Sequence, residues 1–132
     1  MKKQLSTTAL STLLLMTSMT NATAATGLAA FGGSGWTTSP VAFSNANGTF
    51  TVTNYAISNF ASWAATPGVH VVTGDFNGDG RTDLAAYGGS GWTTSPVAFS
   101  NADGTFYVTN YAISNFASWA ATPGVQVVTG NF

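Results

Sequence analysis

Residues 69–87 read VHVVTGDFNGDGRTDLAAY, and this stretch decides the fold because two apolar runs enclose one polar loop. Alternate residues of a tight loop can turn inward, so their oxygen atoms can surround one cation. Side chains that carry oxygen stand at loop positions one, three, five and nine, and these are Asp75, Asn77, Asp79 and Asp83. Together with the backbone carbonyl of Arg81 at position seven, they predict a site for Ca2+.

The sequence on both sides of this loop is typical of strands. An EF-hand would carry helices there and a bidentate Glu at position twelve, where this chain has Ala86. Gly78 and Gly80 allow the positive φ angles that such a loop needs. The loop therefore predicts a β-protein. The alternative interpretation is a surface turn that is rich in Asp, Asn and Gly and binds no metal.

An internal repeat covers most of the chain. Residues 26–76 and 82–132 are offset by 56 positions and differ at only six of 51. The differing pairs are Gly27/Asp83, Phe31/Tyr87, Asn47/Asp103, Thr51/Tyr107, His70/Gln126 and Asp75/Asn131. Two of these pairs affect the loop, so the calcium site is expected once. Residues 26–81 form repeat 1 and residues 82–132 form repeat 2.

The length of the repeat, its glycine-rich turns and its regularly placed aromatic residues predict an all-β fold of two four-stranded propeller blades. A β-sandwich of two motifs is the competing architecture. In the second blade the predicted strands are residues 69–76, 84–87, 92–99 and 105–112. Pro96 predicts a bulge or a late start in the third strand. Asn47-Gly48 and Asp103-Gly104 favour a type I′ hairpin turn.

Antiparallel strands reverse at every loop, which divides the loops between two faces. The metal loop and the hairpin share one face. The glycine-rich loop after the second strand and the connection after the fourth share the other, and they carry four indoles: Trp36, Trp63, Trp92 and Trp119. Indoles beside Ser, Thr and Asn with few charges suit a neutral sugar, whose C–H face stacks on an aromatic ring. The alternative is that the indoles fill the space between blades.

The N-terminal residues predict export. Lys2 and Lys3 precede an apolar run and then Ala22-Thr23-Ala24, which is typical of a signal peptide over residues 1–24. A membrane anchor is less favoured because the run is short and interrupted by Ser and Thr. Without this segment, Arg81 is the only Lys or Arg beside four aspartates, so binding to nucleic acid or anionic lipid is not expected.

Residues 71–89, VVTGDFNGDGRTDLAAYGG, resemble the FG-GAP (VCBS-type) calcium-binding propeller repeat. With GSGWTTSPVAFSN and NFASWAATPGV, the whole unit resembles bacterial propeller lectins of the Photorhabdus type and, more distantly, fungal lectins of the Psathyrella type. The resemblance implies calcium ligation by the five loop residues. It also implies binding of monosaccharides such as fucose or N-acetylglucosamine in pockets repeated around a seven-bladed ring. This chain departs from that pattern because it has two repeats.

Composition argues against an enzyme. After the predicted cleavage the chain has one histidine, His70, and no Cys, Glu or Lys, so the usual pairs of nucleophile and base are missing. The function expected from the sequence is a secreted, calcium-stabilised lectin. The alternative is a non-catalytic structural or adhesion module, or a fragment of a larger FG-GAP propeller protein.

The order of the strands predicts assembly. The two repeats run 2-3-4-1-2-3-4-1, so one blade is complete and the other is divided between the chain ends. Two blades cannot close a ring, since propellers have about four to eight. We therefore expect a head-to-tail homo-oligomer in which residues 125–132 enter the first blade of the next copy, beside residues 28–31. The alternative is a truncated copy of a longer propeller.

Overall fold

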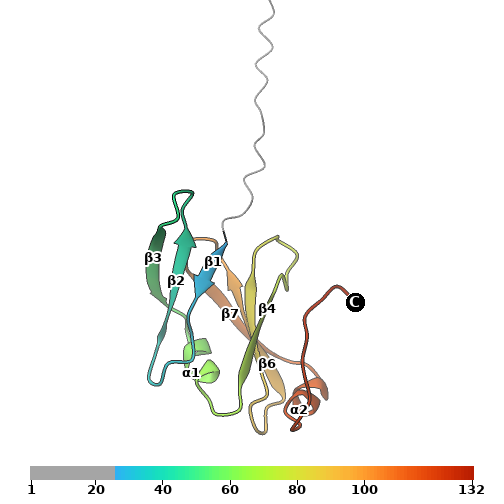
Figure 1. Cartoon of the computed structure of the whole chain (residues 1–132). Coiled ribbons are helices and arrows are strands. Elements are labelled where there is room, and N and C mark those ends of the chain that lie inside the picture. The colour runs from blue at the N-terminus through green and yellow to red at the C-terminus, as the bar shows by residue number, and fades with distance from the viewer. Residues whose placement is uncertain (1–25) are drawn as a thin grey trace, which may run out of the picture.

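The structure is a computed structural model that describes residues 26–132, so the predicted signal peptide lies outside the described residues. Two antiparallel sheets pack beside each other (Figure 1). The elements in chain order are β1 (Gly27–Ala29), β2 (Thr38–Ser44), β3 (Phe50–Ala56), α1 (Phe60–Ala64), β4 (His70–Gly74), β5 (Asp83–Tyr87), β6 (Thr94–Ser100), β7 (Phe106–Ala112) and α2 (Phe116–Ala120). Among these elements no helix has the length and apolar character needed to cross a membrane.

Each sheet joins strands that follow one another in the chain. The larger sheet has the order β4-β5-β6-β7, which is the predicted complete blade. The smaller sheet has the order β1-β2-β3, equivalent by the repeat to β5-β6-β7 without an inner strand. The predicted strands are confirmed with shifts of one or two residues at their ends. This arrangement is consistent with propeller-like blades.

The prolines of β2 and β6 are accommodated by the serines that precede them. Ala30 N donates to Pro40 O at 2.9 Å, but Pro40 has no N–H to return the bond. The Ser39 hydroxyl donates to Ala30 O at 2.9 Å instead, and Ser95 does the same to Ala86 O at 2.8 Å. Of the two outcomes predicted at Pro96, the late start is confirmed, because β6 begins at Thr94, and no bulge forms against β7, since the two strands pair from Thr94 to Ser100 without a skipped residue.

The hairpin between β2 and β3 is not the predicted type I′ turn. Gly48 N donates to Asn45 O at 3.0 Å, and Asn45 N donates to Thr49 O at 2.8 Å. Three residues therefore lie in the loop, and Gly48 has a φ of 81° while Asn47 is not among the residues with positive φ. This is a type I turn followed by a left-handed glycine, the common solution for a three-residue hairpin loop.

The core lies between the two sheets and includes a helix that the sequence did not predict. Its buried side chains are Ile57, Phe60, Ala61, Leu84, Ala86 and Ala98. Helix α1 contributes Phe60 and Ala61, both with 0% exposure. Five helical residues are too few to show a 3.6-residue period, so the pattern of apolar residues gave no signal.

The two ends of the sheets differ as the alternation of the loops predicts. The β2–β3 and β6–β7 turns and the β4–β5 loop lie at one end, and α1, α2 and the glycine loops lie at the other (Figure 1). The glycine loop after β5 approaches the neighbouring connections closely: a Cβ at Gly88 would lie 2.8 Å from Gly68 O and 3.9 Å from Ala120 O. The predicted metal loop and the indole-bearing loops are therefore at opposite ends.

Candidate functional site

The first residue of the β4–β5 loop holds the loop in shape. Asp75 Oδ1 accepts hydrogen bonds from Gly78 N at 2.7 Å and Asp79 N at 3.0 Å, and Asp75 Oδ2 accepts one from Gly80 N at 2.8 Å. The Gly80 N–H is the main reason that the pKa of Asp75 lies below its ordinary value; the other loop N–H groups add to this, and desolvation opposes it. Gly78 and Gly80 have φ of 79° and 80°. The loop therefore folds around an ionised carboxylate.

The middle of the loop is a network around Asp79. Its Oδ1 accepts from Arg81 N at 2.8 Å, and its Oδ2 accepts from Asn77 Nδ2 at 2.9 Å and pairs with Arg81 Nη2 at 2.7 Å. Arg81 Nε also donates to Ser100 O at 2.8 Å. The sequence assigned Arg81 a role through its carbonyl alone and missed this side-chain bridge from the loop to the end of β6.

The last predicted ligand, Asp83, is buried. It begins β5, has 0% exposure, and accepts hydrogen bonds from Phe76 N at 3.0 Å on Oδ2 and from Ser100 N at 2.9 Å on Oδ1. The one ion pair within residues 26–132 joins Arg81 to Asp79, so Asp83 has no cationic side chain against it in this part of the chain. Buried charges in proteins are usually paired or bound to a metal.

The loop residues fit a calcium ion in chemical type. They offer three carboxylates, one amide oxygen and a backbone carbonyl, which are the hard oxygen donors that Ca2+ takes. Each carboxylate can accept more bonds than it receives from the loop N–H groups. In residues 26–132, no three His, Cys, Asp or Glu side chains come together as a metal-holding group. A bound ion would therefore have to draw the three carboxylates closer.

Two of the predicted indoles, those of Trp36 and Trp92, are held in position by contacts with a nearby glycine. The backbone N–H of Trp36 donates to Gly33 O, and that of Trp92 donates to Gly89 O, both at 3.1 Å. Each indole then folds back over its glycine, so that a Cβ at Gly33 or Gly89 would overlap the ring. Any larger residue at these glycines would displace the indole.

The four indoles have different surroundings. Trp63, on α1, and Trp92, after β5, are half-buried and pack against the same core between the sheets. Trp36 is 42% exposed and Trp119, on α2, is 62% exposed. The structure thus brings Trp63 and Trp92 to one core and leaves their repeat equivalents, Trp119 and Trp36, open to solvent.

Comparison with known proteins identifies one segment. Residues 67–108 match the FG-GAP repeat, from the turn before β4 through the loop and into β7. Neither the curated proteins nor the solved structures include a match to the chain. The matched segment contains all five predicted loop residues and most of the four-stranded sheet. Residues 67–108 therefore form an FG-GAP repeat.

Proposed function

We propose that this chain is a secreted, calcium-stabilised carbohydrate-binding protein, a lectin, whose sugar sites lie at the end of the sheets that carries the glycine loops and helices. FG-GAP repeats often bind calcium. The observation that carries the calcium part is Asp83, a carboxylate with 0% exposure and two neutral N–H donors. A cation in the loop would supply the opposite charge that this group lacks. Its role there would be structural.

Calcium is expected to raise the melting temperature of the parent protein, and Asp79→Asn is expected to remove most of that increase. Asparagine keeps an oxygen acceptor for Arg81 N but loses the negative charge. The exposed ion pair with Arg81 contributes at most about 1 kcal/mol, so the melts in EDTA should nearly coincide. At 100 times its Kd, an ion adds about 2.7 kcal/mol, which is roughly 10 °C or more for a domain of this size. Differential scanning fluorimetry measures both shifts.

Asp103→Asn is the matched control for this measurement. It removes the same charge from the β6–β7 turn, where Asp103 Oδ1 accepts from Thr105 N at 2.9 Å. Repeat 1 already has Asn47 at this position, accepting from Thr49 N at 3.1 Å. The control should retain the full calcium shift. Equal melts of the parent protein with and without calcium would refute the site.

The sugar part of the proposal is supported by the distribution of charge and of exposed indoles. Arg81 and the four aspartates lie in the β4–β5 loop, at the start of β5 and in the β6–β7 turn, away from the end that carries the helices. At that end Trp36 and Trp119 are exposed, while Trp63 and Trp92 are partly used by the core. A neutral, hydroxylated ligand suits such a surface because it offers a C–H face to the indole.

A glycan array with calcium and EDTA arms tests the sugar part. Trp119→Ala should weaken binding about tenfold, the effect of losing ~1.4 kcal/mol of stacking, with no change in melting temperature. Trp63→Ala, its repeat equivalent, should lower the melting temperature because its indole packs against the core. If a folded sample binds no glycan at millimolar free sugar, the lectin proposal is wrong.

The second candidate is a non-catalytic structural or adhesion module, or part of a larger FG-GAP protein. The packing of Trp63 and Trp92 against the core favours it, because those indoles then serve to join the sheets. It predicts calcium stabilisation without glycan binding. We expect no enzymatic activity under either proposal, since a glycosidase needs two carboxylates across a cleft and three of the four aspartates here belong to one loop.

A further inference from the structure

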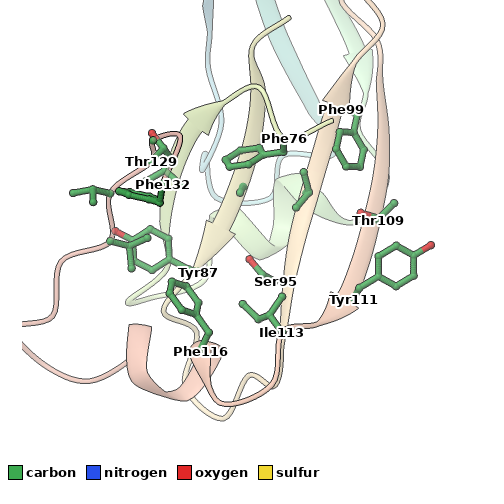
Figure 2. A pocket seen from close by; sticks show the side chains of 16 residues that line it. Phe76, Tyr87, Ser95, Phe99, Thr109, Tyr111, Ile113, Phe116, Thr129 and Phe132 are labelled. Atoms are coloured by element: carbon green, nitrogen blue, oxygen red, sulfur yellow. The ribbon is translucent and has the colours of Figure 1, made fainter. Parts of the chain in front are cut away.

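An apolar groove runs along the outer face of the four-stranded sheet, the face turned away from β1-β2-β3. Its volume is about 480 Å³, and it is bounded on the other side by residues 127–132. Figure 2 shows the aromatic and aliphatic side chains that turn into it. From the sheet and the segment that follows it come Val97, Phe99, Tyr111, Ile113 and Phe116. A groove of this composition on an outer sheet face indicates a surface that packs against something else.

Repeat 1 shows what covers such a face. Phe60 is the repeat equivalent of Phe116, and Ile57 is that of Ile113. Phe60 and Ile57 are 0% and 1% exposed, because β4-β5-β6-β7 packs over them, whereas Phe116 is 46% exposed and Ile113 is half-buried. The paired residues are identical in sequence. The difference is therefore that no second sheet among the described residues packs over this face, which only residues 127–132 border.

On the outer face of β1-β2-β3 the exposed residues belong to repeat 1, and their buried equivalents belong to repeat 2. Leu84 is 3% exposed in the core, while its repeat equivalent Leu28 is 63% exposed on the outer face of β1-β2-β3. On the same face Val52 is 64% exposed, while its equivalent Val108 is half-buried against the core. The groove on the four-stranded sheet is therefore equivalent, by the repeat, to one side of the interface between the chain's own two sheets. The open face of β1-β2-β3 is equivalent to the other side of that interface.

The edges of the two sheets also differ between the repeats, because one edge is paired and its equivalent is open. Strand β5 pairs with β4 on its inner edge, but the equivalent edge of β1 has no strand partner within residues 26–132. Residues 125–132 match residues 69–76 at six of eight positions, yet no strand forms there. They lie on the opposite side of the four-stranded sheet from β1 (Figure 1). Within residues 26–132 the edge of β1 and this segment therefore do not meet.

We propose that a second copy of this chain packs the outer face of its β1-β2-β3 sheet into the groove, and that residues 126–130 of the first copy pair with β1 of the second. In the chain's own β4–β5 pairing, Val72 lies opposite Ala85. Shifted by one repeat, that register places Val128 opposite Ala29 of the next copy. We choose a second copy as the occupant because Leu28 and Val52 on its open face are the repeat equivalents of Leu84 and Val108. Leu84 and Val108 lie on the face of the four-stranded sheet that packs against repeat 1 within one chain.

This contact is head-to-tail, since each copy offers one groove and one complementary face. Repeated contacts of this kind close into a ring when the rotations add up to a full turn. With two blades per chain and about four to eight blades in known propellers, two to four copies are expected to complete a ring. The assembly depends neither on calcium nor on sugar binding, so it can fail or hold independently of the proposed function.

Paired cysteines test the predicted register on a background that has no cysteine. We would combine Ala29→Cys with Val128→Cys, whose residues are both exposed in the single chain. Directly opposed strand residues have Cα atoms about 4.5–5.5 Å apart, within the range that a disulfide spans. After mild oxidation, a denaturing gel without reductant should show a ladder that ends at the number of chains in the ring, which is two to four. Each single variant should show no more than a dimer.

The matched control is Val72→Cys with Ala85→Cys, which reproduces the pair inside one chain. It should form a disulfide without any increase in mass on the denaturing gel. Native mass spectrometry and light scattering of the unmodified protein supply a measurement that needs no variant, and both should give two to four times the chain mass. A folded monomer at micromolar concentration, as a blade of a longer propeller would give, overturns the proposal. So does an oligomer in which the Ala29 and Val128 cysteines do not link.

Discussion

Replacing Phe60 by alanine is expected to lower the free energy of unfolding by about 3–5 kcal/mol. The Phe60 side chain has 0% exposure and belongs to the buried cluster that joins α1 to β5 and β6. Alanine would leave a cavity in the core between the two sheets. Urea denaturation followed by circular dichroism measures the change.

Phe116→Ala is the matched substitution in repeat 2. At a dilution where the chain is monomeric, it should cost less than about 1.5 kcal/mol, because the ring is already 46% exposed. At higher concentration its cost should rise toward that of Phe60→Ala as the proposed docking buries Phe116. Equal losses of unfolding free energy for the two substitutions in the monomer would contradict the conclusion that Phe60 is covered by the second sheet and Phe116 is not.

Asp83→Ala is expected to have the second largest effect, about 2–4 kcal/mol of unfolding free energy in EDTA. The substitution leaves Phe76 N and Ser100 N without the carboxylate oxygens that they bond at 3.0 and 2.9 Å. Because these bonds join the loop and the end of β6 to β5, the β4–β5 loop should also lose protection in hydrogen exchange. Chemical denaturation together with amide exchange measures both changes.

Two controls sharpen this measurement. Asp103→Asn removes one negative charge at an exposed turn and should leave the unfolding free energy in EDTA nearly unchanged. Repeating the Asp83→Ala measurement in calcium should give a larger loss than in EDTA, because a ligand is then missing as well. Unchanged stability of Asp83→Ala in EDTA would mean that Phe76 N and Ser100 N find other partners, and the assignment of Asp83 as a structural link would be wrong.

Local features of the fold could be predicted because they depend on neighbouring residues. The alternation of apolar runs and glycine-rich turns predicted four strands in the second blade, over residues 69–112, and all four form. Local sequence also explains the turn at Thr122-Pro123-Gly124, where Gly124 has a φ of 84° and Val125 N donates to Thr122 O at 3.1 Å, as in a type II turn. Proline and glycine restrict the backbone locally, so their position alone determines such turns.

Other features of the candidate site escaped prediction because they depend on atoms far apart in the chain. Asp83 looked like one of several loop ligands, but its burial depends on Ser100, which comes from another strand. Arg81 reaches the same residue through its side chain, by the bond from Nε to Ser100 O. The short helices gave no periodic signal, although α1 provides two residues of the core.

The two repeats separate what the sequence determined from what the tertiary structure decided. The sequence by itself determined that residues 69–76 and 125–132 favour a strand, and that Phe60 and Phe116 favour burial, since the pairs are nearly or wholly identical. Only the tertiary structure decided that His70–Gly74 is a strand and Phe60 is buried, while residues 125–132 form no strand and Phe116 is exposed. The reason is physical: a strand needs a hydrogen-bonding edge and burial needs an opposing surface, and both come from other parts of the molecule.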